Sequence, residues 1–284
     1  MKFNLRAMAF AAAALVSGGA QADIFNVATG DGSVYFVAID ADANIAFTAD
    51  LGMRLSDFTN SATFTSGLAA PVTWNFATNA VSRDFAGTEA WSTAYNTFKT
   101  TQTGSNFLWG VVSGDNVSAG SVTNRNTLST GNATQGQMVA LTTTAPISNA
   151  LTAFANWEAG TNSLGNIAAA NTNGAASVTS SNGIAYLTNF GSIQGNFNGT
   201  NTWNYLLANG LSSTFQRAQQ ATGGVITQFG NPNAVDSLAA NPITFTFDIA
   251  TDTLVLAPVP EPGTYAMLLV GLATVGFMAR RRKA

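Results

Sequence analysis

Carboxylates are the main side chains in this chain that could catalyse a reaction or bind a metal, because the sequence contains no histidine and no cysteine. Without those residues the chain cannot form a Ser-His-Asp triad, a cysteine nucleophile or an ordinary zinc site. Two carboxylates are enough for glycoside hydrolysis, and oxygen ligands alone are enough for calcium. Sugar hydrolysis and calcium binding are therefore the chemistries to consider for the aspartates and glutamates.

The densest group of oxygen-bearing side chains consists of Asp40, Asp42, Asn44 and nearby Asp50. Its Asp-x-Asp-x-Asn pattern resembles the opening of a calcium loop, which makes these residues the candidate metal ligands. Ile45 stands where an EF-hand needs glycine, and Leu51 stands where it needs a bidentate glutamate. We therefore favour an acidic hairpin loop with Asx turns, and we predict no bound metal and no cofactor.

Two glutamates, Glu89 and Glu158, lie close in sequence to Trp91 and Trp157. Paired carboxylates near aromatic rings suit sugar hydrolysis, since the acids supply the catalysis and the rings can stack on the sugar. The sequence sets no distance between the two glutamates. We favour surface acids beside buried tryptophans, and we predict that the protein is not an enzyme.

Thr-x-Thr pairs are a further candidate feature, at Thr63/Thr65, Thr244/Thr246 and Thr251/Thr253. On a flat sheet such pairs could form an array of hydroxyl groups, as some ice-binding surfaces do. Their spacing along the chain is irregular, which favours the solvent-facing side of ordinary strands.

Three segments of different chemistry follow one another at the C-terminus. Pro260, Glu261 and Pro262 come first, and the prolines hold the chain extended, which suits the cleft of a protease or transpeptidase. The apolar run from Tyr265 to Ala279 comes next, and we expect it to form one transmembrane helix, although it is shorter than the usual ~20 residues. A basic cluster ends the chain and predicts a cytoplasmic C-terminus: Arg280, Arg281, Arg282 and Lys283.

The N-terminus has the pattern of a secretory signal peptide. Its charged start, apolar stretch and Ala-x-Ala site are, in order, Lys2 with Arg6, Ala7 to Val16, and Ala20 with Ala22. Cleavage by signal peptidase after Ala22 predicts a mature protein that starts at Asp23. We therefore expect an exported precursor that its C-terminal tail holds in the cytoplasmic membrane.

The order of the C-terminal segments resembles that of the PEP-CTERM family of exported bacterial proteins. The resemblance covers only residues 258–284 and rests on Pro260, Glu261, Pro262, the apolar run and the basic cluster. It implies that an exosortase cuts near the Pro-Glu-Pro element, and that the body reaches the outer surface or extracellular matrix of a Gram-negative bacterium. The family is associated with exopolysaccharide, biofilm or flocs, so polysaccharide is an implied partner.

Residues 23–257 are expected to fold as a single extracytoplasmic domain between the signal peptide, residues 1–22, and the tail. This body contains thirteen acids and five cations, which gives a net charge of −8 and no basic face for nucleic acid. Lys99 is its only lysine. Its polarity comes mostly from Asn, Thr, Ser and Gly, which suit turns and exposed sheet faces.

Alternation of apolar and polar residues predicts the strands, most clearly over Ile243–Ile249. The predicted strands are Val34–Ile39, Ile45–Thr48, Val72–Phe76, Asn106–Val112, Gln137–Thr143, Ile184–Thr188, Val225–Phe229, Ile243–Ile249 and Thr253–Leu256. Apolar residues at helical spacing predict three short helices, over Trp91–Phe98, Ile147–Phe154 and Trp203–Phe215. We interpret residues 160–183 as a long surface loop. The expected fold is mainly β, a β-sandwich or jelly-roll-like domain with a few short helices in its connections.

These observations favour an exported surface or matrix protein whose body is structural or adhesive within exopolysaccharide, biofilm or floc. Two alternatives stay open from the sequence. One is a secreted carbohydrate-active enzyme that uses carboxylates alone, and the other is a calcium- or glycan-binding module.

Overall fold

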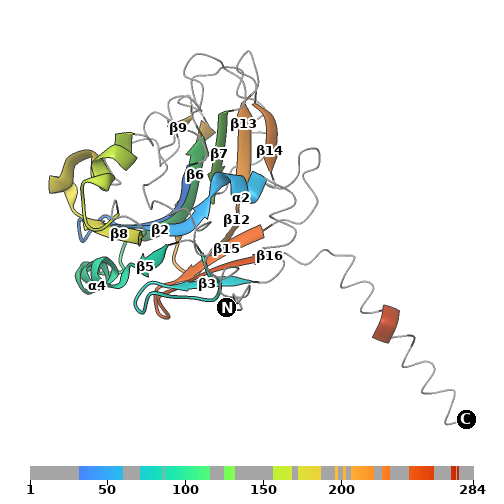
Figure 1. The fold of residues 1–284 in the computed structure, drawn as a ribbon, viewed down its shortest axis with the longest axis horizontal. Coiled ribbons are helices and arrows are strands. Elements are labelled where there is room, and N and C mark those ends of the chain that lie inside the picture. Colours follow the sequence, from blue (N-terminus) through green and yellow to red (C-terminus); the bar gives the residue numbers. More distant parts are fainter. Residues whose placement is uncertain are drawn as a thin grey trace, which may run out of the picture.

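The protein is a mainly β structure with two principal sheets and a few short helices, as the sequence predicts (Figure 1). The computed structural model describes residues 32–59, 71–85, 87–115, 125–131, 156–167, 172–186, 196–197, 201–202, 206–220, 226–230, 243–258, 270–272 and 274.

The larger sheet is built around the hairpin of β1 and β2. Its strand order is β14-β13-β7-β6-β1-β2-β8-β5, with β11 paired to β6 beside this path. The described pairs are antiparallel except for β5 with β8, which run parallel. The strand bounds are β1 (Ser33–Asp40), β2 (Ile45–Arg54), β5 (Thr88–Ala90), β6 (Phe107–Asp115), β7 (Arg125–Ser129), β8 (Thr172–Val178), β11 (Leu207–Ala208), β13 (Gln216–Gln220) and β14 (Ile226–Gly230).

The smaller sheet contains the closing hairpin of the body. Its strand order is β12-β15-β16-β3-β4 and all its described pairs are antiparallel. The bounds are β3 (Val72–Asn75), β4 (Ala80–Val81), β12 (Ser212–Thr214), β15 (Ile243–Asp248) and β16 (Thr253–Pro258). A separate two-stranded ladder joins β9 (Asn196–Phe197) to β10 (Asn201–Thr202).

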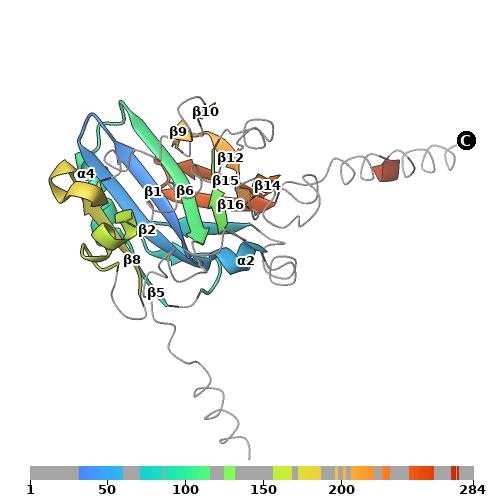
Figure 2. The same ribbon diagram turned by 90° about the horizontal axis from the view of Figure 1, so that it is seen from above.

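An aromatic core lies between the two sheets. Alternate residues of β1 and β2 face it, including Phe36 and Phe47, because side chains on a strand alternate between its two faces. The Phe36 ring stacks on Phe76 and contacts Phe247 of β15, each with 4.7 Å between ring centroids. Figure 2 shows β6, β1 and β2 side by side in one layer, with β15 and β16 in another. The core thus forms without any disulfide.

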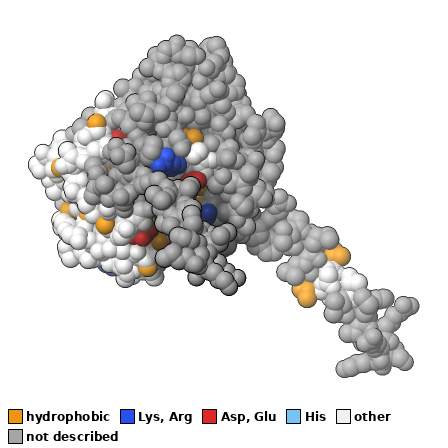
Figure 3. All heavy atoms as spheres, in the orientation of Figure 1, with side chains coloured by type: hydrophobic (Ala, Val, Ile, Leu, Met, Phe, Trp, Pro, Cys, Tyr) orange, Lys and Arg blue, Asp and Glu red, His pale blue; other side chains and the backbone are white. Residues whose placement is uncertain are grey.

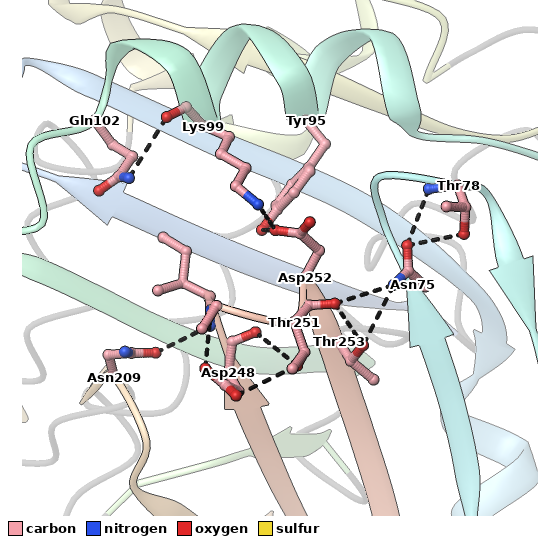
Figure 4. A network of polar contacts seen from close by, with 12 residues as sticks. Asn75, Thr78, Tyr95, Lys99, Gln102, Asn209, Asp248, Thr251, Asp252 and Thr253 are labelled. Atoms are coloured by element: carbon pink, nitrogen blue, oxygen red, sulfur yellow. Dashed lines mark hydrogen bonds and ion pairs between the residues drawn. The ribbon is translucent and has the colours of Figure 1, made fainter.

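Helix α4 (Ser92–Thr101) packs against this core with Tyr95 and Phe98, which confirms the helix predicted over Trp91–Phe98. The Tyr95 hydroxyl donates a hydrogen bond to Asp252 Oδ1 at 2.9 Å, and Lys99 Nζ lies 2.5 Å from the same oxygen (Figure 4). Asp252 stands in the turn between β15 and β16 with a φ of 59°, a conformation that aspartate tolerates better than most residues. The only lysine of the body therefore fastens α4 to the closing hairpin.

The other helical segments in the described residues are short. They are α2 (Leu55–Thr59), the 3-10 helix η2 (Ser180–Ala185), residues 156–162, and residues 270–272 with 274. The helix predicted over Ile147–Phe154 lies outside the described residues, just before the segment 156–162. The predicted strand Gln137–Thr143 and the predicted signal peptide, with Asp23, also lie outside them.

Most of the predicted strands are confirmed. The structure contains β1, β3, β6, β14, β15 and β16 within a few residues of the predicted bounds. Strand β2 continues from Ile45 to Arg54, well beyond its predicted end at Thr48. The alternation of core-facing residues continues through Ala49, Leu51 and Met53, with Asp50 and Gly52 at the intervening positions.

The surface loop predicted over residues 160–183 is wrong. Strand β8 crosses this stretch between β2 and β5, and its Ala175 and Ala176 are buried. Close packing explains why glycine occurs in this stretch, because a Cβ on Gly174 would lie 2.2 Å from the Asn166 carbonyl oxygen. A Cβ on Gly165 would lie 2.4 Å from the Ala175 carbonyl oxygen. Two of the small residues that suggested a loop, Gly165 and Gly174, are therefore required by neighbouring backbone.

The helix predicted over Trp203–Phe215 is also wrong. The described residues of this range form β11 and β12, separated by a turn in which Gly210 has a φ of 74°. An apolar step of four residues is an even number, so it fits the two-residue period of a strand as well as a helix. The strand predicted over Ile184–Thr188 fails at its start, where η2 occupies residues 184 and 185.

Candidate functional site

The acidic loop between β1 and β2 is organised by one buried carboxylate, that of Asp40. Its Oδ1 accepts hydrogen bonds from the backbone N–H groups of Asp42 at 3.1 Å and Ala43 at 3.0 Å. Its Oδ2 accepts from the Thr103 N–H at 2.6 Å, the Thr103 hydroxyl at 2.9 Å and the Gly104 N–H at 2.9 Å. Burial alone would raise the pKa of Asp40, but these hydrogen bonds outweigh it and hold that pKa below the usual 3.8.

The other candidate metal ligands do not gather around Asp40. Asp42 and Asn44 are exposed in the turn. The hairpin register pairs Asp40 with Ile45 and Asp50 with Tyr35, so the two acids lie five residue pairs apart, or about 17 Å along the sheet. Among the residues that the structure describes, no cluster of three or more acidic side chains could hold a metal ion. The Asp40 carboxylate instead joins the hairpin turn to the chain after α4.

Asp50 lies in a different environment on the same hairpin. Its side chain is buried, and its Oδ1 accepts a hydrogen bond from the Gly52 N–H at 2.8 Å. Burial raises the pKa of Asp50 from 3.8 to about 6, although the hydrogen bonds from Gly52 and Ser33 and the charge of Arg54 oppose the rise. A neutral Asp50 is therefore accessible close to physiological pH.

Glu158 belongs to the same region as Asp50. It is fully buried on the helical segment 156–162, next to Trp157, whose ring meets Tyr35 edge-on at 5.5 Å. Burial raises the pKa of Tyr35 well above 10, and the negative charges of Glu158 and Asp50 raise it further. Tyr35, Asp50 and Glu158 form what we call the buried acid cluster, on the face of the larger sheet that points away from the aromatic core.

The two glutamates predicted as candidate catalytic acids do not share an open surface. Glu89 is half-buried on the edge strand β5, opposite Asn173 of β8. The Glu158 side chain has no exposed surface, so a polymer in solution cannot reach it without a local opening of the fold. Tyr35, which the sequence analysis did not single out, is the residue that Glu158 faces.

The tryptophans are structural wherever the structure describes them. Trp74, Trp91, Trp109 and Trp157 are buried, and their indole N–H groups donate to the backbone carbonyls of Leu51, Asp50, Ala208 and Ala185 respectively. This confirms the buried tryptophans predicted beside Glu89 and Glu158, but the surface position predicted for Glu158 is wrong, because its side chain is fully buried. Burial of the tryptophans also means that these four rings offer no face on which a sugar could stack.

The described Thr-x-Thr pairs lie on or beside the smaller sheet. Thr244 and Thr246 alternate with the buried residues of β15 and so point away from the core. Thr251 lies in the turn before β16, where Thr253 is the first residue. Thr63 and Thr65 lie outside the described residues.

The C-terminal tail starts where the body ends. Strand β16, an interior strand of the smaller sheet, has Pro258 as its last residue, paired with Ile243. Beyond it the structure describes only residues 270–272 and 274, which are helical. No helix in the described ranges is long and apolar enough to cross a membrane. Pro260, Glu261, Pro262 and the basic cluster lie outside those ranges, so the transmembrane helix stays a prediction.

Comparison with known protein families gives one result. Residues 258–283 match the PEP-CTERM protein-sorting motif. This confirms the resemblance seen in the tail and indicates an exported protein that an exosortase processes for the cell surface. The match covers the tail alone, and residues 1–257 are not assigned to a family by it. Neither a curated protein nor a solved structure matches the chain.

Proposed function

We propose that the mature body is a structural or adhesive component of an extracellular polysaccharide matrix and does not cut the polymer that it contacts. The observation that carries the proposal is the sorting motif at residues 258–283, because it directs the body to the cell surface. The motif begins at the last residue of β16, so a cut at or beyond Pro260 would release a body with all its described strands intact.

The body has the features of a passive, durable module. Three of its described acids are committed to internal positions: Asp40 to five protein donors, Asp252 to α4, and Glu158 to a buried site. Its core contains no disulfide, so its stability does not depend on whether the surroundings are oxidising or reducing. The net charge of −8 favours contact with neutral glycans, since acidic polymers would be repelled unless divalent cations bridge the two.

The sorting half of the proposal is tested by Glu261→Ala in the producing cell. We expect an unprocessed form to accumulate in the cell membrane, because the exosortase would no longer recognise the Pro-Glu-Pro element. Glu89→Ala, the same change at a half-buried position in the body, is the matched control and should be processed normally. Normal processing of Glu261→Ala would remove the basis of the proposal.

The matrix half is tested with the processed protein and the exopolysaccharide of the producing cell. Co-sedimentation without any fall in polymer size is the expected result. A steady fall in polymer size that is lost in Glu89→Gln or Glu158→Gln would instead identify a carbohydrate-active enzyme.

A further inference from the structure

The outer side of the smaller sheet carries many uncharged hydrogen-bonding groups, which Val255 and Ala257 interrupt on β16. Its core-facing residues alternate with outward ones, so that Ser213, Phe245, Leu254 and Trp74 are buried while their neighbours point outward. The outward residues that carry a hydroxyl or amide define what we call the hydroxyl face: Ser212, Thr214, Thr244, Thr246, Thr253, Thr73 and Asn75.

Strand register brings these residues together although they come from four segments of the chain. On β12 and β15, Ser212 lies opposite Thr246, and Thr214 lies opposite Thr244. On the same face but nearer the other edge of the sheet, Thr253 of β16 lies opposite Asn75 of β3. Neighbouring strands are about 4.8 Å apart, and outward residues of one strand are about 6.8 Å apart, so the four hydroxyls of β12 and β15 form a regular two-by-two grid.

Contacts within the face hold several of its groups in place. The Ser212 and Thr246 hydroxyls are hydrogen-bonded to each other. The Asn75 amide donates to Thr253 Oγ1 at 3.4 Å and to the Thr251 carbonyl at 3.1 Å (Figure 4). Threonine is also stiff at χ1, so little conformational entropy is lost when its hydroxyl binds a ligand.

The chemistry of the face selects one class of partner. The outward positions of β12, β15, β16 and β3 include no Lys or Arg, and their one acid, Asp248, lies where β15 ends. A polyanion or nucleic acid would find no cation there. The apolar outward residues of β16, Val255 and Ala257, are small, whereas protein interfaces are enriched in aromatic residues, Met and Arg. On the described part of the surface that Figure 3 shows, a few Lys, Arg, Asp and Glu side chains lie among many uncharged ones.

We propose that the hydroxyl face is the surface through which this protein contacts a neutral polysaccharide. The inference rests on the proposed matrix function and names its binding surface. Sugar hydroxyls both donate and accept hydrogen bonds, and serine and threonine hydroxyls do the same. A flat glycan chain lying across β12 and β15 meets a hydroxyl on each strand, and one crossing β16 at Thr253 meets the Asn75 amide of β3 next. Each contact is weak, and binding strength comes from repetition along the polymer.

The test is affinity electrophoresis of the processed protein in gels that contain hydroxyethylcellulose, which is neutral, or alginate, which is acidic. Hydroxyethylcellulose should retard the unchanged protein and alginate should not. The variant Thr244→Val/Thr246→Val removes two central hydroxyls but keeps shape and strand preference. It should weaken binding by about tenfold, from the loss of two hydrogen bonds of ordinary strength. The matched control is Thr97→Val/Thr100→Val on the exposed side of α4, which should bind normally.

Each further outcome separates this inference from the proposed function. If the double variant binds as tightly as the unchanged protein, the hydroxyl face is not the contact surface and the matrix function still stands. Tighter binding to alginate would overturn the inference that the partner is neutral, and the matrix function would still stand. If the unchanged protein binds neither hydroxyethylcellulose nor the producer's own exopolysaccharide, both proposals fail. A concentration-dependent dimer that the double variant abolishes would show that the face binds a second copy of this chain instead. A melting curve for each variant checks that the fold is kept.

Discussion

The two faces of the β1–β2 hairpin differ in the way they are stabilised. The face toward the smaller sheet carries Phe36 and Phe47 and is closed by aromatic contacts from α4 and β15. The opposite face carries Tyr35 and Asp50 and is covered by the helical segment that holds Glu158. One pair of strands thus supports an apolar core on one side and a buried acid cluster on the other.

This difference separates two sources of stability that respond to different conditions. Burial of apolar rings gains free energy roughly in proportion to the area removed from water, and it does not depend on pH. A buried carboxylate costs free energy when it ionises, so the other face weakens as pH rises. Paired substitutions on the two faces can therefore show how much each contributes.

The largest effect is expected from Phe36→Ala, which removes the ring that Phe76 and Phe247 contact. The free energy of unfolding should fall by about 3–5 kcal/mol, because the substitution loses apolar burial and leaves a cavity. Val37→Ala, at the next position and on the opposite face, should cost clearly less because fewer atoms are lost. Urea unfolding of the processed protein measures both, and equal losses would contradict the assignment of the main core to one face.

A smaller, pH-dependent effect is expected from Asp50→Asn. The folded protein holds the Asp50 proton up to a pKa of about 6, whereas the unfolded chain releases it near 3.8. The folded state therefore binds more protons between those values, and the free energy of unfolding falls as pH rises through this window, by roughly 3 kcal/mol. The variant should lose most of this fall and be the more stable protein at pH 7.

Asp40→Asn is the control for that experiment, because the pKa shift of Asp40 has the opposite sign. Its lowered pKa contributes stability above pH 3.8 that is lost as the pH falls below that value. The control variant should therefore be destabilised at neutral pH yet keep the decline between pH 4 and pH 6 that Asp50 causes. If both variants shift the profile in the same direction, the contrast between the two aspartates is wrong.

The smallest effect is expected from calcium. Because Asp40 is already surrounded by protein donors and Asp50 lies at the other end of the hairpin, we expect melting curves with calcium and with chelator to coincide nearly. A ligand that binds only the folded state raises its stability by RT ln(1 + [L]/Kd). An upward shift of many degrees would therefore reveal a calcium site, and Asp40 and Asp42 would be the first ligands to replace.

The strands were predictable where one face of a strand is apolar and the other polar. Ile243 to Asp248 shows this alternation clearly because β15 has one buried face and one solvent face. All eight residues of β1 are buried, so Tyr35, Val37 and Ile39 on its second face hide the alternation, and the strand was predicted from its apolar run and the turn residues that flank it. Strand β8 gave no apolar signal because its residues are small, and at Gly174 neighbouring backbone leaves no room for a side chain. Such packing depends on segments distant in the sequence, so no local pattern indicates it.

The features of the candidate sites also fall into two groups, those that the sequence shows and those that only the tertiary structure sets. The chain alone supplied the Pro-Glu-Pro element and its flanking segments, because a processing enzyme reads a short extended stretch and needs no folded context. The absence of His and Cys was equally visible in the sequence. Only the tertiary structure decided that Glu158 faces Tyr35, that Asp40 and Asp50 have opposite pKa shifts, and that hydroxyls from β12, β15, β16 and β3 share one face. Burial, hydrogen bonding and strand register set those properties, and all three arise between residues far apart in the chain.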